Sequence, residues 1–160
     1  MERDALVSAC GRYRYWLTRA WDQSLSEIAF VMLNPSRADH LVDDPTIRRC
    51  IGFAKDAGFG RLRVVNLFAL RTAYPGELKT APDPAGPENA AHLDAALASG
   101  SAIVAAWGAH GAFGDAAARF VVRANLQAVP MLCLGRTREG HPRHPLYVKT
   151  GQPFAPIQFA

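Results

Sequence analysis

The chain has 160 residues, the length of one domain, so a separate cofactor module beside a catalytic one is not expected. Hydrophobic residues make up 49% of the chain and charged residues 20%, which excludes wholesale disorder. The 18 Lys and Arg against 14 Asp and Glu give a net charge of +4, which is compatible with a polyanionic partner but does not identify one.

The sequence lacks the features of membrane and secreted proteins. No apolar run approaches the length of a membrane span, and the first residues do not have the layout of a secretory signal. Cys10, Cys50 and Cys133 are far apart and form no CxxC pair, so we expect reduced thiols rather than disulfides or a thiolate zinc site. We therefore expect one cytoplasmic domain, residues 1–160, with no membrane partner and no obligate protein partner.

The first predicted element is an edge strand at residues 13–18, because this segment carries β-favouring aromatic side chains. Residues 28–33 form a continuous apolar run that is too short for a helix and indicates a buried strand. Residues 45–57 have apolar side chains at helical spacing, with Pro45 in the first turn and Gly58 just beyond the end. This segment is predicted to be a helix.

The same alternation continues to residue 134. We expect a strand at residues 62–67, a helix at 87–98, a strand at 102–107, a helix at 112–127 and a strand at 130–134. Strands that alternate with helices favour a parallel sheet covered on both faces. The predicted fold is an α/β domain, a three-layer α/β/α sandwich around a central, mostly parallel sheet of four to five strands.

Polar residues follow several predicted strands at the place where open α/β sheets bind ligands, beyond the carboxyl ends of the strands. Residues 34–39 (Asn-Pro-Ser-Arg-Ala-Asp) follow the first buried strand, and Asn66 ends the second. Residues 107–110 (Trp-Gly-Ala-His) follow the third, and residues 135–147 follow the fourth. We expect these four segments to meet on one rim.

Two asparagines are candidates in this rim. The carboxamide of Asn34 can hold a water molecule, and Pro35 makes its loop rigid, although Asn before Pro also commonly forms a plain turn. Asn66 ends an apolar strand, where an unpaired amide costs about 1–3 kcal/mol, so it needs either an internal partner or a ligand such as the edge of a nucleobase.

The last loop is basic and contains His141 and His144. It suits a phosphate backbone, and a histidine in it could stabilise an oxygen that becomes negative, while a solvated basic loop is the plainer alternative. Metal ligation by these two histidines and His110 lacks a carboxylate or cysteine at ligand spacing, so neither a metal nor a cofactor is predicted. The cations expected to contact a nucleic-acid backbone are Arg37, Arg136, Arg138, Arg143 and Lys149.

Three acidic residues precede or begin the helix at residues 45–57. Asp44 is placed to cap this helix, which is an ordinary role for Asp at that position. Asp39 and Asp43 are then free to act as bases or to bind a metal. The sequence contains no GxSxG, no GxxxxGK[ST] and no GxGxxG after a strand, which disfavours serine hydrolases, P-loop phosphotransferases and Rossmann dehydrogenases.

Four motifs resemble, in the same order, the loops of the uracil-DNA glycosylase superfamily. They are VMLNPS at 31–36, RVVNLFAL at 63–70, IVAAWGAHG at 103–111 and HPRHPLY at 141–147. The chain as a whole, with MLNPSxAD, DDPTIRRC and GxPRHPLY, also looks like domain-of-unknown-function family 1643.

The glycosylase resemblance implies a protein that recognises a base in nucleic acid, most simply DNA, and hydrolyses the N-glycosidic bond of a modified or mismatched base without a cofactor. It implies that Asn34 orients water, that Asn66 reads the base, that His144 bonds to the departing base and that Leu146 is the wedge. Phe68 or Phe113 would stack on the base or lie in the core. The implied substrate contacts are Pro35, Ser36, Asn66, Phe68, Trp107, Gly108, His110, His141 and Leu146.

The first of these loops lacks the acidic residue of the most active branch, and the last reads His-Pro-Leu, so a slow or specialised activity is expected. Two alternatives stay open. One is a module that binds nucleic acid or nucleotide in the same cleft without catalysis. The other is a different hydrolase that uses Asp39, Asp43 and His144.

Overall fold

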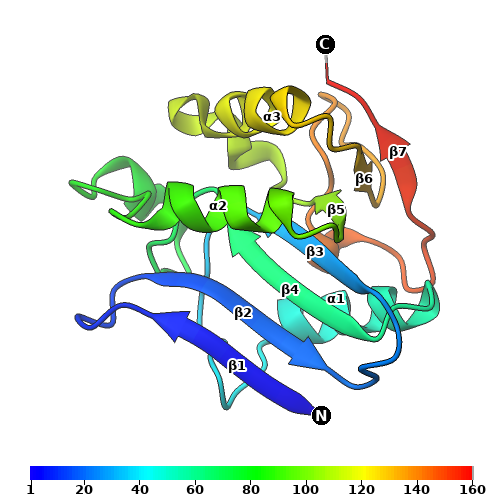
Figure 1. Ribbon diagram of the computed structural model, residues 1–160. Coiled ribbons are helices and arrows are strands. Elements are labelled where there is room, and N and C mark those ends of the chain that lie inside the picture. Colours follow the sequence, from blue (N-terminus) through cyan, green and yellow to red (C-terminus); the bar gives the residue numbers. More distant parts are fainter. Residues whose placement is uncertain (160) are drawn as a thin grey trace.

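Seven strands form one mixed sheet with helices against both of its faces, in a computed structural model that describes residues 1–159 (Figure 1). The order of strands across the sheet is β1-β2-β4-β3-β5-β6-β7. The strands are β1 (Glu2–Val7), β2 (Arg14–Ala20), β3 (Glu27–Met32), β4 (Arg61–Asn66), β5 (Ala102–Ala105), β6 (Met131–Cys133) and β7 (Ala155–Ile157). The helices are α1 (Pro45–Asp56), α2 (Asn89–Ala98) and α3 (Ala116–Leu126).

The centre of the sheet is parallel and its flanks are antiparallel. Strands β4, β3, β5 and β6 run parallel to one another, whereas β1, β2 and β7 join by antiparallel pairing. Apolar residues predominate in the buried parts of the parallel strands, because a polar side chain on a covered face is costly to bury. Each of the four parallel strands overlaps a segment that the sequence predicted as a strand.

The predicted sheet of four to five mostly parallel strands is wrong in number and in pairing. Strands β1 and β7 were missed, because β1 carries exposed polar side chains and β7 has three residues, so neither shows a clear hydrophobic pattern. Residues 14–18 of the predicted edge strand belong to β2, which is not an edge strand, because β1 pairs along its outer side. Three of the six strand pairings are parallel and three are antiparallel.

Each face of the sheet has its own apolar core. Ile28, Phe30 and Met32 of β3 pack with residues of α1, whereas Ala29 and Val31 pack on the opposite face with residues of α2 and α3. This split follows from the alternation of side chains along a strand. None of the helices within residues 1–159 is long and apolar enough to cross a membrane.

A side-chain cap and two residues with positive φ determine where α1 and α3 begin. The cap predicted for α1 is confirmed, since the Asp44 carboxylate accepts a hydrogen bond from the Ile47 amide at 2.9 Å. The predicted helix at residues 112–127 begins as an irregular 3₁₀ turn, Ala109–Asp115, and becomes regular at α3. Gly114 and Asp115 have φ of 59° and 56°, which interrupts a right-handed helix there.

Gly111→Ala should destabilise the protein, because an added Cβ would lie 2.1 Å from the Trp107 ring. The expected loss is about 1–3 kcal/mol in the free energy of unfolding, as for an overpacked core. Gly52→Ala is the matched control: its Cβ meets no atom within 4 Å in the interior of α1, so it should stabilise by about 0.5–1 kcal/mol. Urea unfolding of both variants measures the difference, and equal stabilities would contradict the packing at Trp107.

Candidate functional site

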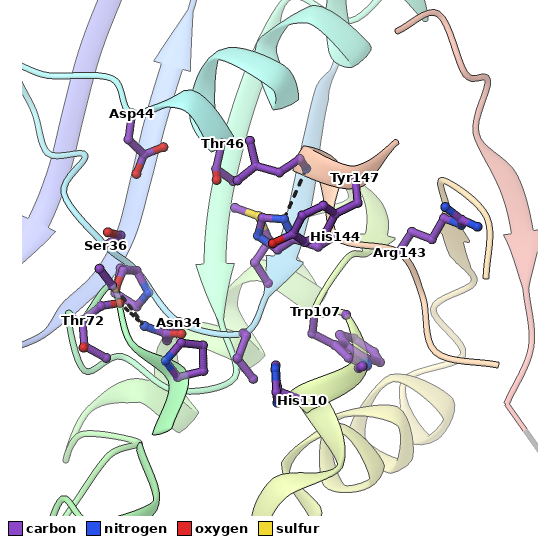
Figure 2. A pocket seen from close by; sticks show the side chains of 18 of the residues that line it. Asn34, Ser36, Asp44, Thr46, Thr72, Trp107, His110, Arg143, His144 and Tyr147 are labelled. Atoms are coloured by element: carbon purple, nitrogen blue, oxygen red, sulfur yellow. Dashed lines mark hydrogen bonds between the residues drawn. The ribbon is translucent and has the colours of Figure 1, made fainter. Parts of the chain in front are cut away.

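A pocket of about 470 Å³ lies beyond the carboxyl ends of β3 and β5, the two central neighbours in the sheet. After β3 the chain turns to α1 on one face, and after β5 it turns to α3 on the other. Such a point, where neighbouring crossovers leave in opposite directions, opens a crevice in a parallel sheet. Figure 2 shows side chains from both loops and from the His-Pro loop around this pocket.

Asn34 ties two loops together at one side of the pocket. Its amide nitrogen donates to the carbonyl of Thr72 at 2.8 Å and to that of Pro35 at 3.0 Å (Figure 2). Asn34 therefore has a structural role in these loops. Because both of these bonds use the nitrogen, and no described residue donates to Oδ1, the oxygen remains free to accept a bond from water or ligand.

The loop after β5 is fastened to the His-Pro loop. The Gly108 amide donates to the Pro142 carbonyl at 2.9 Å, and a Cβ on Gly108 would come within 3.5 Å of the His144 Cβ. That distance is ordinary van der Waals contact, so it is the φ of 73°, in the left-handed region, that favours glycine at position 108. On the other side, Arg49 of α1 donates to the carbonyls of Val148 and Pro145. These bonds hold His144 over the pocket.

His144 is half-buried and its pKa is lowered from the usual value of histidine, chiefly because burial disfavours the charged ring, with Asp44 acting in the opposite direction. Its Nδ1 accepts a hydrogen bond from the Leu146 amide at 3.2 Å. A neutral imidazole that accepts at Nδ1 carries its proton on Nε2. At neutral pH the ring is thus a neutral donor in the pocket wall.

Asp44 also lines the pocket, together with Thr46 in the first turn of α1 (Figure 2). Only a capping role was predicted for Asp44, and one carboxylate oxygen does cap the helix. No described residue donates to the second oxygen, which leaves it available to a ligand. Asp44 is the only carboxylate among the described residues that line this pocket.

Arg14 was not anticipated. It lines the pocket and is only 1% exposed, and its Nη1 donates to the Ala38 carbonyl at 2.9 Å. A shift in the β1–β2 register leaves Tyr15 without a partner in β1, and bulges of this kind redirect neighbouring side chains. Burial lowers the pKa of Arg14 to about 10, with Asp44 opposing the change, so the guanidinium is charged at neutral pH.

The structure brings most of the predicted motif residues to the pocket. Those in its lining are Asn34, Pro35, Ser36, Trp107, Gly108, His110, Arg143, His144 and Leu146. Asn66 is not among them, although Met32, its direct neighbour in the sheet, is. The Asn66 amide is buried and neither Oδ1 nor Nδ2 has a partner among the described residues, so of the two predicted alternatives, an internal partner or a ligand, the internal partner is not found.

Phe68 and His141 also lie outside the pocket lining. Phe68 is buried in the core on the side of α2 and α3, where its ring centroid lies 5.5 Å from that of Phe113, so packing is the role that the structure shows for both rings. The amide and carbonyl of His141 pair with Thr137 in the turn of its loop. Of the two histidines in the motif, His144 therefore lines the pocket and His141 does not.

Asp39 and Asp43 have structural partners outside the pocket. Asp39 accepts bonds from the amides of Leu41 and Val42, which lowers its pKa. Asp43 bonds to Arg19 at 2.7 Å, and Arg19 is a fully buried guanidinium. Within residues 1–159, no group of three or more His, Cys, Asp and Glu is arranged to hold a metal ion.

The basic residues are spread over the surface. Only Arg143 of the five predicted cations lines the pocket. Arg136 is occupied by the carbonyls of Gly140 and Gln158. Arg37, Arg138 and Lys149 are exposed, and they lie outside the pocket lining.

A family model described as protein of unknown function (DUF1643) matches residues 14–146, which is most of the chain. The chain belongs to the DUF1643 family. Comparisons with curated proteins and with solved structures gave no match. The part of this DUF1643 chain covered by the family match includes β2 to β6 and the pocket-lining residues from Arg14 to Leu146.

Asp43→Ala should destabilise this DUF1643 protein strongly, because it leaves the buried Arg19 without its counterion. The expected loss is about 3–5 kcal/mol in the free energy of unfolding, measured with urea. Asp94→Ala is the matched control: its bond with Arg123 is equally short, at 2.9 Å, but the Asp94 side chain is 48% exposed. That variant should lose less than about 1 kcal/mol, and similar losses in both would contradict the structural role of Asp43.

The lowered pKa of His144 predicts that stability decreases as pH falls below about 6.5. The unfolded chain takes up the proton first, so this contribution is complete above the unfolded pKa and is lost toward the lower folded pKa, by up to about 1.4 kcal/mol per pH unit. Urea unfolding at pH 7, 6 and 5 should show a smaller decrease for His144→Gln than for the unsubstituted protein. His40→Gln, at an exposed position, should keep the full decrease, and an unchanged decrease in His144→Gln would contradict the assignment.

Proposed function

We propose that this protein recognises a base in nucleic acid and hydrolyses its N-glycosidic bond, as members of the uracil-DNA glycosylase superfamily do. The observation that carries the proposal is that Asn34, Asp44 and His144, which come from three separate segments, line one cavity at the switch point of the sheet. Its volume of about 470 Å³ is in the range of small-ligand sites. We also propose that the parallel strands and their flanking helices correspond to the three-layer core of that superfamily.

The pocket residues supply the groups that such hydrolysis needs. The free oxygens of Asn34 and Asp44 accept bonds from a water molecule and orient it toward C1′ of the sugar. As the water oxygen bonds to C1′, its proton passes to the Asp44 carboxylate. The electron pair of the C1′–N bond goes to the departing base.

His144 acts at the other end of the breaking bond. Its Nε2–H donates to the base oxygen on which negative charge develops, and a neutral donor is suited to this because it does not lose its proton to solvent first. The base then takes up a proton, which Asp44 returns through solvent, and the carboxylate is restored. The net change is the addition of one water across the glycosidic bond.

The mouth of the pocket suits a nucleic acid. Leu146 and Tyr147 line the pocket and are 42% and 77% exposed. Apolar and aromatic side chains at such a rim can replace a base that has been rotated out of the stack, a movement that costs a few kcal/mol. Arg143, which also lines the pocket, supplies a cation for the phosphate backbone.

A module that binds a nucleotide without cleaving it is the second candidate. It is supported by the Asn34 side chain, whose nitrogen is fully engaged in joining loops, and by the single pocket carboxylate, which already caps a helix. Such a module would show salt-sensitive binding and no product.

The experiment uses the full chain with oligonucleotides that carry uracil, hypoxanthine, oxidised bases or alkylated bases, in single and double strands. Abasic product is detected by alkaline cleavage at stoichiometric protein. Asp44→Asn should lower the rate by about 10²–10⁴-fold, as for loss of a general base, because Asn keeps the helix cap and removes the charge. His40→Gln, at an exposed position outside the pocket, should cleave at the unsubstituted rate.

Release of no base from any of these oligonucleotides would overturn the hydrolase proposal. Salt-sensitive binding of the same oligonucleotides without product would establish the second candidate instead. Cleavage that persists in Asp44→Asn would remove Asp44 from the mechanism. Unfolding in urea checks that the variant is folded: Asn keeps the helix cap, and a modest loss of stability is expected because Asp44 no longer offsets the charge of the buried Arg14.

A further inference from the structure

Arg14 carries a buried charge that has no counterion in contact with it. No carboxylate of residues 1–159 forms an ion pair with it, and its Nε has no hydrogen-bond partner among them. Arg19, on the same strand, is equally buried, yet it binds Asp43 at 2.7 Å and donates to several backbone carbonyls. Burial alone therefore does not explain the state of Arg14.

A buried cation is costly unless a partner compensates for its charge. The largest stabilising charge on Arg14 at longer range is that of Asp44, whereas the charges of Arg71 and Arg19 act against it. Asp43 is paired with Arg19, so Asp44 is the nearby carboxylate left to offset the charge of Arg14, and Arg71 adds a further positive charge from outside the pocket lining. The floor of the pocket, defined here by the buried Arg14 side chain, is therefore positive.

The N-terminus of α1 adds to this potential. Thr46 and Ile47, in the first turn of this 12-residue helix, line the same pocket as Arg14. The unpaired amides and the dipole at the start of a helix favour negative groups. Asp44 uses part of that capacity by capping Ile47, but its carboxylate does not contact the guanidinium.

We propose that the floor of the pocket is an anion subsite, in which the Arg14 guanidinium binds an anionic oxygen of the ligand. A carboxylate, a phosphate or the charged oxygen of a departing base would present the same chemistry. The last of these rests on the proposed hydrolysis, in which the electrons of the broken bond move onto the base. The subsite itself requires binding only.

A purely structural role would have a different signature. Among residues 1–159, the one hydrogen bond of the Arg14 side chain joins Nη1 to the Ala38 carbonyl. If that bond were the purpose of the side chain, its loss would lower stability. If Arg14 is held for a ligand, Arg14→Met should have an equal or higher melting temperature, because an apolar side chain of similar length removes an uncompensated buried charge.

The test compares small anions with a neutral molecule of the same size. Acetate, acetamide and inorganic phosphate are titrated at constant ionic strength into the ¹⁵N-labelled chain, and the Nε–H signals of arginine are followed together with the melting temperature. The Arg14 signal is assigned by its absence from Arg14→Met. Arg12→Met is the matched control, because Arg12 is exposed and outside the pocket lining.

We expect acetate or phosphate to shift the Arg14 Nε–H signal and to raise the melting temperature, and acetamide to do neither. Arg14→Met should weaken anion binding by about tenfold or more, the effect of losing a charge-assisted hydrogen bond, while Arg12→Met keeps it. The anion that binds with the higher affinity, acetate or phosphate, indicates whether the natural ligand carries a carboxylate or a phosphate. Anion binding without cleavage of any oligonucleotide would keep the subsite and remove the hydrolase.

Equal responses to acetate and acetamide would overturn the inference, as would unchanged anion affinity in Arg14→Met. A lower melting temperature of Arg14→Met, with no anion effect on the unsubstituted chain, would assign Arg14 a structural role. The melting temperatures with acetate, phosphate and acetamide are measured on the unsubstituted protein, so this part of the test does not depend on the folding of the variant.

Discussion

Two neighbouring parallel strands, β3 and β5, send the chain to opposite faces of the sheet, and the pocket exists because of this divergence. Backbone at the end of a parallel strand must leave the sheet, and where neighbouring connections part, no helix fills the space between them. The bonds between Gly108 and Pro142 and between Arg49 and the residues after His144 then close the sides. The position of the site is thus a property of topology, and its chemistry comes from the loops.

The sequence predicted the core of the fold because the central strands and α1 carry strong local signals. The run at residues 28–33 is apolar throughout, and α1 has its Asp44 cap and Pro45 at the start. The flanking strands β1 and β7 are held by pairing with β2 and β6, which no local pattern reveals. Edge strands of this kind depend on tertiary context more than on propensity.

Site residues in the loops that follow strands were predicted, whereas the site residue that depends on the register between β1 and β2 was missed. Asn34 directly follows a predicted strand, His144 lies in the loop that follows another, and both line the pocket. Arg14 reaches the pocket through a one-residue shift between β1 and β2, and an alternating Arg-Tyr-Arg-Tyr segment looks the same with or without such a shift. Asn66 shows the reverse: its position at a strand end is as expected, but its side chain is enclosed outside the pocket lining.

The Asp44 carboxylate serves the backbone of α1 with one oxygen and faces the pocket with the other. Anything that draws electron density or a proton onto this group alters the strength of its bond to the Ile47 amide, because the two oxygens share one delocalised charge. A ligand in the pocket therefore affects the first turn of α1, the helix that packs against one face of the sheet. Hydrogen exchange at the Ile47 amide should therefore change when a ligand occupies the pocket.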